Sequence, residues 1–165
     1  MDDGIDTGKV ISNIEIPITN DIDLGLLYQL SFIAEGEVFE KAYSKEFSEK
    51  NFRNIVKNPI YYSRKEKDLE ITDQDSIDDI LKKVRAFGVP SICARFYRDN
   101  NEYKIISAKI IDNSILNTLF SNAINDEILC IYDTNVLVKI EDKYIRFQML
   151  DLGNLQIGDS FFDFH

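Results

Sequence analysis

The residues best suited to chemistry lie at the end of the chain, which reads IGDSFFDFH. His165 is the only histidine, and histidine is the usual general base near neutral pH. A catalytic imidazole has to be oriented by a second group, whereas the end of a chain is poorly held. A Ser–His–Asp or Cys–His arrangement would depend on this same residue. We therefore expect no catalytic residues, and we expect the protein not to be an enzyme.

Motifs for metals and cofactors are also missing from the sequence. The glycine-rich phosphate loops G-x-G-x-x-G and G-x-x-x-x-G-K-[ST] do not occur. An EF-hand counted from Asp73 fails, because Asp78 stands where glycine is needed and Val84 stands where glutamate is needed. Neither Cys93 nor Cys130 has a second cysteine or a histidine at ligand spacing. The sequence therefore predicts no metal and no cofactor.

An acidic helix face is the first candidate for a binding surface. The segment TDQDSIDDILKKVRAFG has apolar residues at helical spacing on one face and acidic residues on the opposite face. The candidate partner-binding residues of this segment are Asp73, Asp75, Asp78 and Asp79. Aspartates in a first helical turn can also cap free N–H groups and complement the helix dipole, with no binding role. Both interpretations stay open.

The aromatic tail is the second candidate surface. Phe161 and Phe162 stand between Asp159 and Asp163. The phenylalanines can pin the chain end onto the core, which is the usual fate of terminal aromatic residues. Exposed instead, they would form an apolar anchor with a charged rim, as at a protein interface. We keep the four residues as candidate partner-binding residues.

The charge of the chain limits its partners. The 165 residues carry a formal net charge of −10. Such a charge argues against non-specific binding to nucleic acids or anionic lipids and favours rapid encounter with a basic protein. The acidic segments are nevertheless interrupted by two basic segments, 41–66 and 81–110. No run of about 18 apolar residues and no leader peptide appears, so we expect a cytoplasmic protein that does not span a membrane.

The periodicity of the apolar residues predicts an α+β fold. We expect residues 1–8 to be a flexible acidic N-terminus and residues 9–165 to form a single domain. The domain should be a mostly antiparallel sheet with about three to four helices packed on one face, ending in a three-stranded meander. The expected elements are a strand over 10–18, a helix (or a strand) over 20–36, a strand over 38–43, helices over 44–59, 72–88 and 113–125, a hairpin over 91–111 and the meander over 127–150.

A small acidic protein of this kind resembles the bacterial immunity and antitoxin proteins, such as those of contact-dependent growth inhibition. The acidic segment TDQDSIDD and the acidic and aromatic segment DSFFDF are of the type that such proteins use against basic toxins. The resemblance implies an immunity protein that binds a basic, nuclease-type toxin domain and blocks its active site by direct contact. It also implies a protein without nucleic-acid or membrane partners, and we favour a monomer.

Three alternatives remain at the level of the sequence. The first is a DNA mimic of the anti-restriction type, which needs acidic residues spaced like phosphates; the basic segments 41–66 and 81–110 count against it. The second is a structural or scaffold subunit of a phage or bacterial assembly. The third is an enzyme that uses carboxylates and a metal ion, because pairs of carboxylates meet only in the folded chain.

Overall fold

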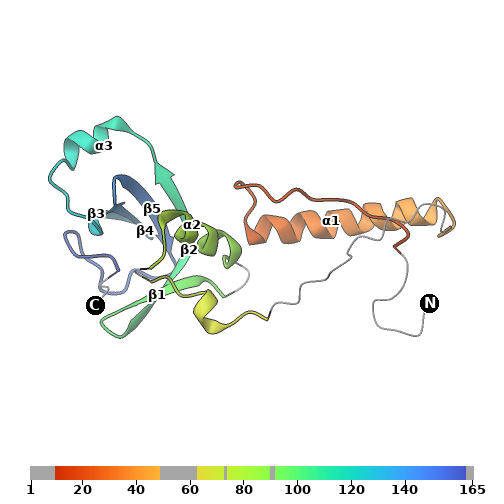
Figure 1. Cartoon of the computed structure of the whole chain (residues 1–165), viewed down its shortest axis with the longest axis horizontal. Helices are drawn as coiled ribbons and strands as arrows, with labels where there is room; N and C mark the ends of the chain where they lie inside the picture. The colour runs from red at the N-terminus through yellow and green to blue at the C-terminus, as the bar shows by residue number, and fades with distance from the viewer. Residues whose placement is uncertain (1–9, 49–62, 73, 90–91, 163–165) are drawn as a thin grey trace. The chain divides into compact units, whose positions relative to one another are not determined.

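The structure is a computed structural model of the whole chain (Figure 1). It describes residues 10–48, 63–72, 74–89 and 92–162. The chain divides into two compact units, which we describe separately. The N-terminal unit comprises Met1–Ile22 and Leu26–Ser63, and the C-terminal unit comprises Asp23–Gly25 and Arg64–His165. The single domain expected over 9–165 stays a prediction.

The N-terminal unit is built around the long helix α1 (Leu24–Tyr43), and the segment that precedes α1 runs beside the helix (Figure 1). The helix expected over 20–36 is confirmed, but it continues to Tyr43, so the strand expected over 38–43 is wrong. The sequence VFEKAY contains good helix formers, and Lys41 lies 3.9 Å from Glu37 one helical turn earlier.

Two other expectations for the N-terminal unit also change. The strand expected over 10–18 is wrong, because Ile14 and Ile16 face α1 and these residues pair with no strand in the described part of the chain. The helix expected over 44–59 is not found in its first residues, because 44–47 form turns. The remainder of that expected helix, from residue 49 on, lies outside the described residues.

The C-terminal unit contains a five-stranded antiparallel sheet, which confirms the predicted α+β class. The strands are β1 (Ala94–Arg98), β2 (Asn101–Ile111), β3 (Glu127–Tyr132), β4 (Asn135–Ile140) and β5 (Lys143–Met149), in the order β1-β2-β5-β4-β3. The predicted hairpin and the final meander are therefore confirmed. Asp99 and Asn100 join β1 to β2 with φ angles of 49° and 62°, as a two-residue hairpin turn requires.

One helix packs on each face of this sheet, so the expectation that the helices share one face is wrong. Helix α2 (Ile77–Ala86) buries Ile77, Ile80 and Val84 in the main core beside β2 (Figure 1). Helix α3 (Ser114–Leu119) packs on the opposite face, where Leu116 and the following Phe120 contact a second cluster of apolar residues. A single 3₁₀ turn, η1 (Glu66–Asp68), precedes α2.

Four phenylalanines form the centre of the main core. Phe161 stacks on Phe147 with ring centroids 4.8 Å apart and lies 4.7 Å from Phe96. Phe162 meets the Phe96 ring edge-on at 5.1 Å. These contacts join β1, β5 and the end of the described chain, so Phe161 and Phe162 are part of the core.

Both edges of the sheet are covered by short extended segments. Residues 69–71 run parallel to β1, with Ile71 N donating to Arg95 O (2.7 Å) and Arg95 N donating to Leu69 O (2.9 Å). Residues 158–161 lie along β3, where Ile128 N donates to Asp159 O at 2.9 Å. These bonds use backbone groups that an edge strand would otherwise leave open to pairing with another chain.

Candidate functional site

The described acidic residues of the predicted helix face differ in their local contacts. Asp75 forms an ion pair with Lys83, whose Nζ lies 2.7 Å from Oδ1, and it accepts a hydrogen bond from Thr72 N. Asp78 is exposed on the first turn of α2. Asp79 accepts a hydrogen bond from the Ser76 hydroxyl, whose oxygen accepts in turn from Asp79 N. Asp73 lies outside the described residues.

The phenylalanines of the tail are buried and do not form an exposed anchor. Phe161 has 0 % and Phe162 2 % of its surface exposed, so the alternative in which they pack in the core is the correct one. Asp159 lies beside them and forms an ion pair with Arg98. Asp163 lies outside the described residues. The assignment of the aspartates to a binding surface stays a prediction.

The sheet itself presents a different candidate site, built on a pair of like charges. Lys109 of β2 lies directly opposite Arg146 of β5 in the antiparallel register. The alternation along β5 places Arg146 on the face opposite the buried Ile145 and Phe147. No carboxylate in the described part of the chain forms an ion pair with either cation.

Polar side chains lie on one side of these two cations, and on the other side Arg146 lies opposite the apolar Leu137 of β4. Next along the same face, the Ser107 hydroxyl donates a hydrogen bond of 3.2 Å to Gln148 Oε1, and Asn135 of β4 pairs with Gln148 on the other side. We call Ser107, Lys109, Asn135, Arg146 and Gln148 the cationic sheet face. At the end of this face away from Gln148, α3 covers the sheet, because Leu116 and Phe120 pack on Leu137 and Tyr144.

The arrangement of charges on this face is suited to binding an anion. Like charges directly opposite each other across two strands destabilise a sheet, and a bound anion relieves that repulsion. An arginine guanidinium can hold a phosphate or carboxylate through two parallel N–H donors, and a neighbouring lysine adds a mobile positive charge. The hydroxyl and amide groups of Ser107 and Gln148 can contribute further hydrogen bonds. The cationic sheet face can therefore hold a phosphate or carboxylate group.

Sequence reasoning missed this face, because only the outward orientation of Arg146 could be predicted from the sequence. Lys109 and Arg146 are far apart in the chain and meet only through the pairing of β2 with β5. A β-bulge between Ile105 and Ser107 shifts the register of β2, and it decides which side chains of β2 share a face with Arg146. Alternation alone identifies Arg146 as facing away from the core, but it does not reveal which residue lies opposite.

Two groups among the described residues have displaced pKa values, and both lie on other parts of the C-terminal unit. A hydrogen bond from Ser76, with a further contribution from Lys82, lowers the pKa of Asp79. Hydrogen bonding to Glu66 raises the pKa of Arg95, against the opposing effect of burial. Among the residues that the structure describes, no three side chains of histidine, cysteine, aspartate or glutamate come together to hold a metal ion.

The sequence match defines the family to which this α+β unit belongs. Residues 64–160 match the family described as formyl transferase, C-terminal domain. This match covers more than half of the chain, and the chain therefore belongs to that family. The matched region begins where the C-terminal unit resumes, at Arg64, and it contains the whole cationic sheet face. No curated protein matches the chain.

This family membership corrects the functional predictions made from the sequence. The resemblance to immunity and antitoxin proteins is wrong, and so are the predicted function in toxin neutralisation and the predicted basic toxin partner. The expectation that the protein is not an enzyme is also wrong, because the family is that of an enzyme domain. TDQDSIDD is acidic without any aromatic residue, and the described phenylalanines of DSFFDF are buried, so the two segments carried too little information for the assignment. The match gives no support to a DNA mimic or a scaffold subunit.

Hydropathy along the helices adds one further observation. Within the described ranges of the chain, no helix is both long enough and apolar enough to cross a membrane.

Proposed function

We propose that this protein takes part in formyl transfer and that its C-terminal unit holds the formyl acceptor or donor by an anionic group. The observation that carries the proposal is the match of residues 64–160 to the C-terminal domain of formyl transferases. The cationic sheet face within this region adds a physical means of binding. The cytoplasmic location expected from the sequence forms part of the same proposal.

Formyl transfer moves an HC=O group from a donor to a nucleophilic acceptor. The bond between the formyl carbon and the donor breaks, a bond to the acceptor nitrogen or oxygen forms, and the proton that the acceptor loses replaces the formyl group on the donor. We assign binding to the cationic sheet face and assign no bond-making role to it. Lys109 and Arg146 would hold a remote anionic group equally well in the ground state and in the transition state, so their contacts would lower KM and leave kcat little changed.

The test follows formyl groups in extracts supplied with ¹⁴C-labelled formate. Extracts of cells from which the gene has been deleted are compared before and after addition of the purified full chain, and label is measured in formylated small molecules and in macromolecules. The proposal predicts that label in at least one formylated product falls on deletion and returns when the chain is added. Unchanged labelling of every fraction by deletion and by addition would contradict a role in formyl transfer.

A variant pair separates binding from other contributions to this labelling. The double substitution Lys109→Ala and Arg146→Ala removes both cations of the sheet face. Lys143→Ala removes an exposed lysine at the start of β5, outside this face, and serves as the matched control. We expect the double variant to restore label poorly at low substrate concentration and the control variant to restore it fully.

A further inference from the structure

The cationic sheet face carries two positive charges and no negative one. Lys109 and Arg146 lie opposite each other, and the other three members of the face are neutral. Side chains that are directly opposite across two antiparallel strands have Cβ atoms about 5 Å apart, so a single anionic group can contact both cations. Arg146 is half-buried, and its neighbour on β4 is the buried Leu137. Water and salt therefore screen its charge less than they would on an open surface.

The charge of this pair distinguishes between anionic groups. A carboxylate or a phosphate diester carries one negative charge and leaves one of the two cations without a partner. A phosphate monoester carries a charge of about −1.5 to −2 near neutral pH and has three strong acceptor oxygens. Two of these oxygens can accept parallel N–H bonds from the Arg146 guanidinium while the third meets the Lys109 ammonium. The pair of cations is therefore matched best by a phosphate monoester.

Gln148 adds a third donor, and Ser107 sets its orientation. Gln148 stands two residues from Arg146 on β5, about 7 Å along the same face, so both long side chains can reach one phosphate group. The Ser107 hydroxyl donates to Gln148 Oε1 at 3.2 Å. Within the described residues no other hydrogen bond involves the Gln148 side chain, so its two N–H donors are open to a ligand. Without Ser107 the amide could rotate and present Oε1, which repels an anion.

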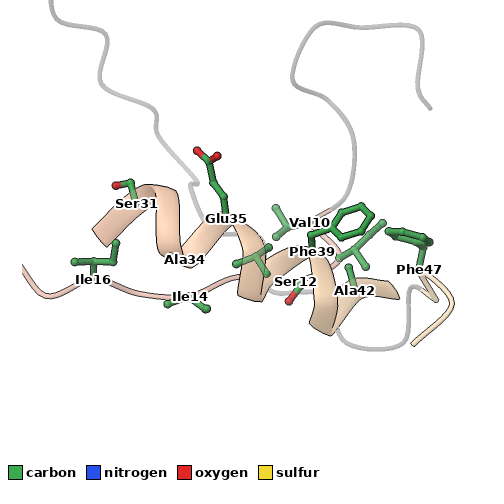
Figure 2. Close-up of a pocket in the computed structure, with 12 residues that line it drawn as sticks. Val10, Ser12, Ile14, Ile16, Ser31, Ala34, Glu35, Phe39, Ala42 and Phe47 are labelled. Atoms are coloured by element: carbon green, nitrogen blue, oxygen red, sulfur yellow. The ribbon is translucent and has the colours of Figure 1, made fainter. Parts of the chain in front are cut away.

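Hollows elsewhere in the described chain are unsuited to an anion. Three of them have acidic side chains and no basic side chain in their lining. Figure 2 shows one of these hollows, where Glu35 of α1 stands among mostly apolar side chains. The second contains Glu127, and the third contains Glu102 and Asp151. The cationic sheet face has no competitor among these three hollows.

We infer that the cationic sheet face binds a phosphate monoester, held by Lys109, Arg146 and the Gln148 amide, and that Ser107 is the positioning residue for that amide. The inference rests on the proposed function, because it names the anionic group by which the formyl donor or acceptor is held. It goes beyond that function by excluding carboxylates and phosphate diesters as the bound group and by giving Ser107 a role.

An NMR titration of the ¹⁵N-labelled full chain tests this inference. The probes are phenyl phosphate, benzoate and methyl phenyl phosphate, which share one ring and differ in the anionic group. At about pH 8 phenyl phosphate is a dianion, because the second pKa of a phosphate monoester is about 6. We expect phenyl phosphate to shift the side-chain N–H signals of Gln148. It should bind about 10-fold or more tightly than either monoanion, because only the dianion satisfies both cations.

Variants assign this binding to the cationic sheet face. Lys109→Ala with Arg146→Ala should abolish the binding of phenyl phosphate, and Lys143→Ala should leave it unchanged. Ser107→Ala should weaken the binding by about 3-fold or more, and Ser107→Thr, which keeps a hydroxyl group, should restore it. In a Gln148→Ala background, Ser107→Ala should have no further effect, because Ser107 acts through the amide. The amide spectrum of each variant shows whether its fold is intact.

Every other outcome counts against the inference. Equal binding of the three probes, or no binding of phenyl phosphate, overturns it. Binding that survives the loss of both cations also overturns it, since the phosphate then lies elsewhere. A Ser107→Ala variant that binds like the wild type removes the positioning role. Formyl labelling that depends on the chain, together with tightest binding of benzoate, rejects this inference alone. Selective binding of phenyl phosphate by a chain without effect on labelling rejects the proposed function alone.

Discussion

Arg98 on β1 and Asp159 near the end of the described chain form an ion pair, with Nη2 and Oδ2 3.0 Å apart. The pair connects the two edges of the sheet, because residues 158–161 lie along β3 while Arg98 belongs to β1 at the opposite edge. The arginine side chain is 14 % exposed and the aspartate side chain 36 %. This contact therefore helps to close the sheet around the phenylalanine cluster.

A double-mutant cycle measures this connection. Arg98→Ala and Asp159→Ala, made singly and together, should give a coupling free energy of about 0.5–1 kcal/mol in urea unfolding, because the pair is only partly buried. Lys82→Ala with Asp79→Ala is the control cycle, since that pair lies 3.4 Å apart on the exposed side of α2. A coupling for Arg98 and Asp159 no larger than that of the control pair would show that the ion pair does not hold the edges together.

The buried tail gives a second prediction. Phe161→Ala should lower the free energy of unfolding by about 3–5 kcal/mol, because it removes a fully buried ring and leaves a cavity. Leu150→Ala removes a residue that is 57 % exposed, and it should cost about 0.5 kcal/mol or less. Equal losses for the two variants in urea unfolding would mean that the tail is not part of the core in solution.

The N-terminal cap of α2 gives a prediction about pH. The hydrogen bond from Ser76 lowers the pKa of Asp79 below its ordinary value of 3.8. Because the pKa is lower in the folded state, this interaction stabilises the fold above the ordinary pKa, and the stabilisation is lost as the pH falls through the folded pKa. Ser76→Ala should raise the pKa of Asp79 toward the ordinary value.

Carboxyl chemical shifts in an NMR titration measure this change. Asn113→Ala removes the cap of α3 instead, where the Asn113 side chain accepts from Ile115 N, and it should leave the Asp79 titration unchanged. If Ser76→Ala leaves the titration of Asp79 where it is in the wild type, the cap is not the cause of the lowered pKa.

The elements that could be predicted from the sequence are those with strong local signals. The helix α2 has an apolar face, acidic residues in its first turn and Ser76 as its cap, so local and tertiary preferences agree. The meander was recognisable because apolar residues alternate and short polar turns separate the strands. Helix α1 was ambiguous, because its apolar residues lie on most sides and fit a strand as well as a helix.

The properties that depend on distant contacts could not be predicted. Ile115 and Leu119 of α3 are apolar but 49 % and 66 % exposed, because only one side of this short helix meets the sheet. The cationic sheet face depends on the pairing of β2 with β5 and on the bulge in β2, neither of which leaves a local signal. Asp75 and Asp79 make local hydrogen bonds at the start of α2, and the acidic pattern alone does not distinguish this role from a role in binding.

The most direct test of the central claim is a kinetic one on the cationic sheet face. In the extract labelled with ¹⁴C-formate, the rate of formyl transfer is measured against substrate concentration for wild type, for Lys109→Ala with Arg146→Ala, and for Lys143→Ala. The account predicts that the double variant raises KM by about 10-fold or more while kcat changes little, because charge-assisted hydrogen bonds of about 1.5–3 kcal/mol are lost from binding alone. An unchanged KM for the double variant, with full transfer activity, would contradict the account.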